Sequence, residues 1–294
     1  EFKTDSITRN TTRIALKFYN DIISEKASYR YSDLSKELIK ILIQGANEIT
    51  NELKEIFENV ITNNWSKHSS PYNDLCDYVL TKTHESIPII KALPNEVMKI
   101  ADLYWFKSTR EYDMFGSEGM NIEQYYSLND NGFDYFPASA LQTPIYWLLR
   151  FSPKETFDFI LSFTNKTVDF YSKSKYGDDV EILDVYVDNK TIQKQFGSNA
   201  LWSMHRGTGS PTTPYVLQCI HMALEKYLLE TAKDDESNYL TGWLRYLILN
   251  SESVSITSVV ASVVKAYPNK YFEIAEILFK TIKMFSYDLA LLAS

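Results

Sequence analysis

NALWSMHRGTGSPTTPYVLQCIHMALEKYLLE, residues 199–230, is the stretch around which we expect the fold to be organised. Its first half combines an indole, Trp202, with the basic pair His205 and Arg206, two glycines and two prolines. Its second half is an apolar run that begins at Tyr215 and repeats at the spacing of a helix. The stretch therefore predicts a polar turn that leads into a long amphipathic helix.

Helical spacing of apolar residues recurs on both sides of this stretch. The strongest signal is a capping box, with Ser152 at N-cap, Pro153 at N1 and Glu155 at N3, which predicts a helix over residues 153–172. The same periodicity predicts further helices over residues 12–24, 32–46, 48–63, 75–81, 96–107, 145–150, 239–250, 256–267 and 270–285.

One segment departs from the helical pattern. Val180, Ile182 and Val185 are β-branched and partly alternate with polar residues, and the alternation resumes at residues 191–193. This predicts a β-hairpin near residues 180–196, which must pack on helices to be stable. We therefore expect a mainly all-α fold, a multi-helix α/α stack or solenoid-like bundle with one inserted β-hairpin.

The length of 294 residues fits a single α-helical domain over residues 1–294, with a potential subdivision near residues 110–137. The chain begins Glu1-Phe2 without an initiator Met and stops in an apolar segment at residues 289–292. We therefore expect it to be a fragment of a larger protein.

Residues 110–137 interleave Gly, Asn and Asp with aromatic side chains and predict a long loop. Tyr125, Tyr126 and Tyr135 are candidate binding residues in it, because tyrosine gives a large contact area at low entropic cost. The alternative is an ordered lid over the core. The sequence leaves both alternatives open.

Composition narrows the classes of partner. Thirty Lys and Arg against 38 Asp and Glu give a net charge of -8, which disfavours nucleic acid. Cys76 and Cys219 lack the spacing of a disulfide framework or a zinc site, which favours a reducing, cytoplasmic compartment. No apolar run approaches the ~20 residues that cross a bilayer. We therefore expect a cytoplasmic location and a protein partner, without a membrane.

Residues 207–210, Gly-Thr-Gly-Ser, invite comparison with a phosphate-binding loop. The P-loop pattern requires a second Gly and a Lys just before the helix, where this chain has Thr213 and Pro214. The favoured interpretation is a turn in which Thr213 caps the helix and Pro214 occupies its first position. We expect no cofactor.

His221 and Glu225 lie four residues apart and share a helix face, with His205 and Arg206 just upstream. Such a set suits a metal site or an acid/base pair. Without an HExxH signature or a third assured ligand, the favoured interpretation is a hydrogen bond or salt bridge between His221 and Glu225, and no metal. Arg206 beside Trp202 predicts a buried structural pair that holds the turn.

Four strings together resemble the α-helical region of very large bacterial STAND-type P-loop NTPases, a group that includes antiviral sensors. They are PASALQTP at residues 137–144, LWSMHRG at 201–207, MALEKYLL at 222–229 and VVASVV at 259–264. The resemblance implies a helical scaffold or sensor region that flanks an ATPase module. This chain has neither a Walker A nor a Walker B motif, so no catalytic residue carries over.

The leading hypothesis is a non-catalytic helical scaffold or sensor module that mediates protein recognition within a larger bacterial protein. The residues proposed for binding are Trp202, His205, Arg206, His221, Glu225, Tyr125, Tyr126 and Tyr135. The alternative is an enzyme of unrecognised class in which His205, Arg206, His221 and Glu225 converge in one pocket.

Overall fold

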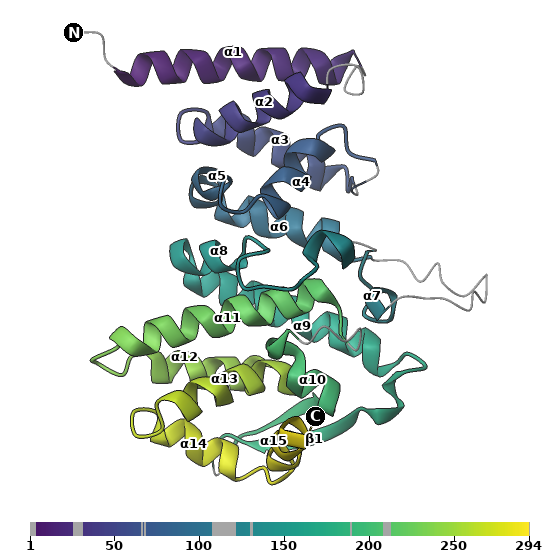
Figure 1. The fold of residues 1–294 in the computed structure, drawn as a ribbon, viewed down its shortest axis with the longest axis vertical. Coiled ribbons are helices and arrows are strands. Elements are labelled where there is room, and N and C mark those ends of the chain that lie inside the picture. Colours follow the sequence, from purple (N-terminus) through teal and green to yellow (C-terminus); the bar gives the residue numbers. More distant parts are fainter. Residues whose placement is uncertain are drawn as a thin grey trace. The chain divides into compact units, whose positions relative to one another are not determined.

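A computed structural model describes residues 4–25, 32–65, 67, 69–107, 122–129, 132–188, 190–207 and 213–293. The chain is mainly helical and has one two-stranded antiparallel hairpin, which confirms the predicted fold class (Figure 1). It divides into two compact units. Unit 1 comprises Glu1–Tyr104 and Arg150–Ser152, and unit 2 comprises Trp105–Leu149 and Pro153–Ser294.

Unit 1 is built from helices that bury aliphatic and aromatic side chains. Its elements are α1 (Thr4–Ser24), α2 (Ser32–Gln44), α3 (Thr50–Thr62), α4 (Asn73–Thr81), α5 (Ile87–Ala92) and most of α6 (Pro94–Trp105). The helices predicted here are confirmed, although α1 begins at Thr4 rather than at residue 12. Residues 87–92 form a further short helix with Pro88 in its first turn, a position where proline is tolerated.

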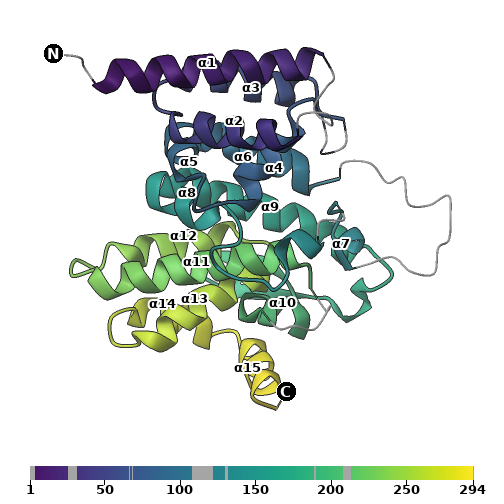
Figure 2. The same ribbon diagram turned by 45° about the horizontal axis from the view of Figure 1, so that its top comes forward.

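Unit 2 begins with the aromatic-rich segment and ends with the C-terminal helices. Its first elements are α7 (Ile122–Tyr125), η2 (Gly132–Tyr135), most of α8 (Ile145–Phe151), α9 (Pro153–Ser172) and η3 (Gly177–Asp179). After the hairpin follow α10 (Asn199–Ser203), η4 (Met204–Arg206), α11 (Tyr215–Asp234), α12 (Leu240–Asn250), α13 (Val254–Ala266), α14 (Phe272–Phe279) and α15 (Lys283–Ala293). Figures 1 and 2 show α11, α12 and α13 side by side.

The hairpin pairs β1 (Glu181–Tyr186) with β2 (Ile192–Gly197) in the register Glu181 to Gly197. It packs on helices, as its small size requires. The amide of Gln195 donates to the backbone oxygen of Ile248 at 3.0 Å, and the Thr257 hydroxyl donates to Gln195 Oε1 at 2.7 Å. These bonds satisfy a buried amide and fix the hairpin against α12 and α13.

The prediction of one helix over residues 270–285 is wrong, because the chain breaks between α14 and α15. Thr281 is buried at the break, and its hydroxyl donates to the backbone oxygen of Asp184 on β1 at 3.4 Å. Its amide closes a turn on the oxygen of Leu278. A hydrogen bond between residues 97 apart in sequence therefore lies at the break.

Among the residues that the structure describes, no helix combines the length and the apolar character that a membrane crossing requires.

Candidate functional site

The candidate site lies where α10, η4 and α11 pack on α13, all within unit 2. Ser198 caps α10 by accepting a hydrogen bond from the Leu201 amide. Gly207 ends η4 at φ 61°, and a Cβ there would lie 2.7 Å from Met222 Sδ. The left-handed backbone conformation favours glycine here, and the Met222 side chain would have to move to admit a Cβ.

The expected turn before α11 is only partly visible, because residues 208–212 lie outside the described part of the chain. The N-cap of α11 is Pro214, and no side chain caps this end. Thr213 instead accepts two hydrogen bonds from the Gln218 amide, at its backbone oxygen (2.8 Å) and at Oγ1 (3.1 Å). The prediction that Thr213 caps the helix is wrong, because its hydroxyl serves a buried amide instead.

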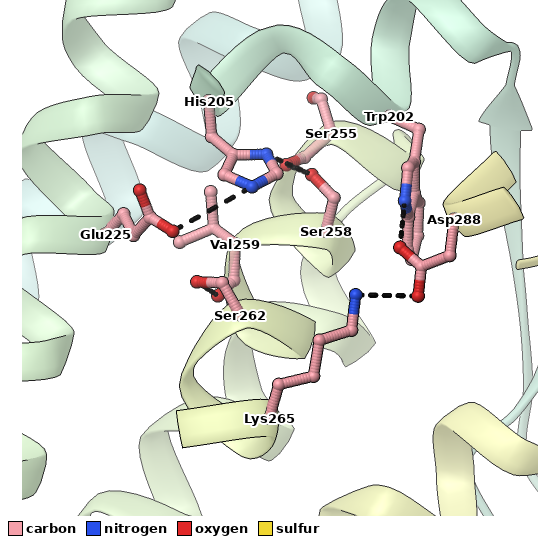
Figure 3. Close-up of polar contacts among 9 residues, drawn as sticks. All are labelled: Trp202, His205, Glu225, Ser255, Ser258, Val259, Ser262, Lys265 and Asp288. Atoms are coloured by element: carbon pink, nitrogen blue, oxygen red, sulfur yellow. Dashed lines mark hydrogen bonds and ion pairs between the residues drawn. The ribbon is translucent and has the colours of Figure 1, made fainter. Parts of the chain in front are cut away.

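Trp202 is buried and connects α10 to α15. Its indole N–H donates to Asp288 Oδ1 at 2.9 Å, and Lys265 Nζ lies 2.6 Å from Asp288 Oδ2 (Figure 3). Its ring also contacts Tyr287, with 5.9 Å between centroids. The predicted buried pair of Trp202 with Arg206 is wrong, because the indole N–H is taken by Asp288 and Arg206 is exposed.

His221 is fully buried and binds in two directions. Its Nδ1 lies 2.7 Å from the backbone oxygen of Leu217, and its Nε2 lies 3.0 Å from Ser255 Oγ. A carbonyl oxygen only accepts, so Nδ1 carries the proton and Nε2 accepts from the Ser255 hydroxyl. Burial lowers the pKa of His221 to about 4, which keeps the imidazole neutral. The predicted bond between His221 and Glu225 is wrong, because α13 supplies the partner.

His205 is 3% exposed and lies between α13 and α11. Its Nδ1 is 3.1 Å from Ser258 Oγ, and its Nε2 is 3.8 Å from Glu225 Oε1 (Figure 3). The Ser258 hydroxyl donates to the backbone oxygen of Ser255 at 2.8 Å, so the proton between Ser258 and His205 belongs to Nδ1. Burial, with Arg206 next to it, lowers the pKa of His205 to about 3. The neutral Nε2 therefore faces a carboxylate without a hydrogen-bond partner.

His205 lies between Ser258 and Glu225, as the histidine of a catalytic triad lies between a serine and an acid. The geometry of the three residues does not suit nucleophilic attack. Ser258 is buried, and its proton goes to a backbone oxygen rather than to the imidazole. The separation of 3.8 Å between His205 and Glu225 exceeds a hydrogen bond. The arrangement instead joins η4 and α11 to α13 through polar contacts.

Metal binding was the other chemistry considered for these residues. Within the described ranges, no group of three or more His, Cys, Asp or Glu side chains is placed to hold a metal ion. Each of the two imidazoles forms a hydrogen bond with a serine of α13: His205 with Ser258, and His221 with Ser255.

The aromatic candidates lie elsewhere in unit 2. Tyr126 is buried and stacks on Tyr171 with 4.3 Å between ring centroids, and the Tyr135 hydroxyl accepts from the indole of Trp105 at 2.7 Å. Both therefore belong to the core, as the lid alternative predicts for these two residues. Tyr125 is half-buried against other side chains. Residues 110–121 and 130–131 of the predicted loop lie outside the described residues.

One surface feature of unit 2 was missed by the sequence reasoning. Five large apolar side chains are exposed on α14, on α15 and in the turn between them: Phe272, Phe279, Ile282, Phe285 and Leu289. We call this set the α14–α15 face. It borders a cavity of about 80 Å³ lined mainly by apolar side chains, among them Ala261, Val264, Ala275, Leu278 and Met284. In a single helix over residues 270–285, Ile282 would lie on the apolar side that faces the core. The sequence pattern therefore predicts a buried Ile282, and the exposed position follows only from the break at Thr281.

Comparison with protein-family models finds no match for the chain, and comparison with curated proteins finds no similar sequence. The candidate site is therefore interpreted from its own geometry.

Proposed function

We propose that this chain is a non-catalytic helical scaffold or sensor module that mediates protein recognition within a larger, cytoplasmic bacterial protein. The observation that carries the proposal is the α14–α15 face. Soluble proteins seldom expose large apolar side chains as one patch, and such patches commonly mark protein interfaces. An apolar cavity beside the patch provides a pocket for an anchoring side chain.

The charges around this face favour a protein over a nucleic acid. Lys265 pairs with Asp288 at 2.6 Å, and Lys283 pairs with Glu181 at 3.0 Å. A lysine that is already paired with a carboxylate neutralises little phosphate charge, so few counterions are released from the phosphate backbone. Such lysines therefore contribute little to nucleic-acid affinity. The net charge of -8 acts in the same direction.

The buried polar network supports a structural role for Trp202, His205 and His221. Trp202, His205 and His221 each bond to another element of unit 2 and orient α10, η4 and α11 on α13. α15 is held in turn by Asp288 on Trp202 and by the Tyr287 hydroxyl on Glu181 at 2.7 Å. These contacts hold α15, which carries Phe285 and Leu289 of the α14–α15 face.

The resemblance to the helical regions of STAND-type NTPases extends the proposal to a sensor role in antiviral defence. In such a protein, this module would bind a protein ligand while a separate module hydrolyses the nucleotide. The experiment for this part is expression of the complete reading frame with and without phage challenge. Loss of protection in an Ile282→Asp, Leu289→Asp double variant that is still made at normal level would support it, and full protection would contradict it.

Site-specific photo-crosslinking tests protein recognition itself. A benzophenone amino acid at position 285, in the α14–α15 face, is expected to crosslink the chain to discrete protein partners in cells. The control places the same amino acid at position 18 of α1, which is also exposed and apolar. Crosslinks of equal pattern at both positions, or none at position 285, would contradict the proposal.

An enzyme remains the second candidate, on one observation. The Nε2 atom of His205 is buried, lacks a hydrogen-bond partner and faces Glu225, which is an arrangement that a substrate proton or a water could complete. A His205→Gln variant keeps the volume and removes the base. Any activity found in the wild-type protein and lost in this folded variant would favour the enzyme over the scaffold.

A further inference from the structure

The exposed side chains of α15 form a stripe of their own. Phe285 and Leu289 lie on α15, four residues apart, and are 39% and 66% exposed, and Ile282, in the turn directly before the helix, is 79% exposed. The stripe continues onto α14 because Phe285 stacks on Phe279, with 5.5 Å between centroids and 10° between ring planes. This spacing is the one by which two helices pack against each other.

The charges next to the stripe divide into two groups. Lys265, Lys283 and their acidic partners form ion pairs inside the chain, as described above. Glu276 and Lys280, on the other hand, are exposed on α14 and directly after it, and neither forms an ion pair with another described residue. The face therefore offers one free negative and one free positive charge beside an uncharged apolar stripe.

We propose that the α14–α15 face binds a second copy of this chain through a two-fold symmetric interface. This rests on the proposed function, because it names the partner of the same recognition face. In an interface with two-fold symmetry, residue i of one copy meets residue j of the other, and residue j meets residue i. Glu276 of each copy then faces Lys280 of the other, and the two apolar stripes cover each other.

The required partner must present an uncharged stripe at helical spacing together with one positive and one negative residue. The chain itself carries such a surface, and it is complementary to itself under two-fold rotation. A strongly basic or strongly acidic partner would leave one of these two charges facing its own sign. The cavity lined by Val264, Leu278 and Met284 has room for one anchoring side chain of the second copy, such as Leu289.

The area of the face sets the expected affinity. Four or five large side chains at these exposures present on the order of 500 Å², less than the ~800 Å² that each partner contributes to a standard stable interface. The dimer is therefore weak and depends on concentration, with a dissociation constant on the order of 10–100 µM. A larger protein that holds two copies close together would raise their effective concentration.

Sedimentation equilibrium across the micromolar range, at low salt, tests the proposal on the intact chain. The wild-type protein is expected to show a monomer–dimer equilibrium. Ile282→Asp, at the most exposed apolar position of the stripe, is expected to weaken it at least about tenfold. The matched control is Ile14→Asp on α1, an exposed isoleucine of unit 1, which is expected to leave the equilibrium unchanged. Circular dichroism checks that both variants are folded.

A charge exchange tests the two-fold geometry. Glu276→Lys alone places two lysines opposite each other at two symmetric points, and Lys280→Glu alone does the same with two glutamates. Each single variant is expected to dimerise several-fold more weakly than wild type. An equimolar mixture of the two variants restores both attractive pairs and is expected to form a heterodimer of near wild-type affinity. High salt is expected to remove the differences.

The proposal is overturned if the wild-type chain stays monomeric over the whole range, or if the mixture associates no better than the single variants. Failure of the proposed function has a different signature. If position 285 crosslinks to other proteins in cells while the chain stays monomeric, the recognition face stands and the second copy is excluded as its occupant. If the chain dimerises and no other protein is captured, self-association is the recognition that the face performs.

Discussion

Unit 1 and unit 2 are both helical, but they bury different chemistry at their centres. Around α2 and α3, unit 1 buries Leu42, Leu53 and Phe57 with few buried polar side chains among them. Around α13, unit 2 buries His205 and His221 together with serines, a threonine and a glutamine that bond to one another. An apolar core responds to changes in volume, whereas a buried polar network also responds to protonation and to the loss of a single partner.

Trp202→Ala is expected to lower the free energy of unfolding of unit 2 by about 4 kcal/mol, because it removes a large buried ring and leaves a cavity. It also removes the N–H that Asp288 accepts. Hydrogen exchange measured by mass spectrometry should show faster exchange in α13 and α15 and little change in α2 and α3. Equal acceleration in both units would contradict the separation into two units.

Trp202→Phe serves as the matched control, because it keeps an aromatic ring and loses only the indole donor. We expect it to cost about 1–2 kcal/mol, the value of a hydrogen bond to a charged group plus a small packing defect. A loss as large as that of Trp202→Ala would assign the effect to the hydrogen bond rather than to the ring.

Acid is expected to destabilise unit 2 before unit 1. The pKa values of His205 and His221 are lowered to about 3 and about 4 in the folded protein, below the ordinary value of 6.5. Below pH 6.5 the two imidazoles are therefore protonated in the unfolded chain but stay neutral in the folded chain. The free energy of unfolding is highest above pH 6.5 and falls as the pH is lowered below that value. Between pH 7 and pH 5, each imidazole is expected to cost about 2 kcal/mol.

The groups that face His205 do not reverse this sign. Arg206, His221 and Lys265 all oppose its protonation, whereas a hydrogen bond with the Trp202 backbone favours it, and the Glu225 carboxylate lies 3.8 Å away. Urea titrations at several pH values measure the effect. His221→Gln should flatten the dependence by about half, and an unchanged slope in this variant would contradict the assignment of a buried neutral imidazole.

The matching test of unit 1 changes volume without changing charge. A Cβ at Gly45 would lie 2.1 Å from Thr12 Oγ1, so α1 and α2 have no room for a methyl group at their crossing. Gly45→Ala is expected to cost about 1–2 kcal/mol through overpacking, with no dependence on pH. In a Thr12→Ala background, Gly45→Ala is expected to cost less free energy of unfolding than it does in the wild-type protein. Strictly additive costs of the two substitutions would argue against this contact.

Lys265→Met is expected to have the smallest effect. The pair of Lys265 with Asp288 is partly exposed, and Asp288 keeps its bond from Trp202. Such pairs contribute about 0–1 kcal/mol. Thermal unfolding should shift by a few degrees at most. A loss comparable to that of Trp202→Ala would show that the ion pair, and not the indole, holds α15.

The elements that were predicted correctly are those whose signals are local. The bounds of α9 match the expected residues 153–172, because a capping box and helical spacing lie within the segment itself. The hairpin also follows from its own alternation. At the break between α14 and α15, Thr281 forms a hydrogen bond with Asp184, which is distant in sequence. No local pattern predicts this contact.

The candidate site shows the same limit at the level of single side chains. Sequence spacing paired His221 with Glu225 and Trp202 with Arg206, because only neighbours along the chain are visible there. The structure pairs His221 with Ser255, His205 with Ser258 and Trp202 with Asp288. Each of these partners comes from another element, and tertiary packing therefore decides which polar groups meet.

We propose a structural role for the buried network of unit 2 and protein recognition for the α14–α15 face. The most direct measurement is quantitative mass spectrometry of the proteins crosslinked through position 285, in wild type, in an Ile282→Asp, Leu289→Asp variant and in His205→Gln. We expect partners to be lost in the first variant and retained in the second. Partners retained in the α14–α15 face variant and lost in His205→Gln would contradict this proposal and would place recognition at the His205 site.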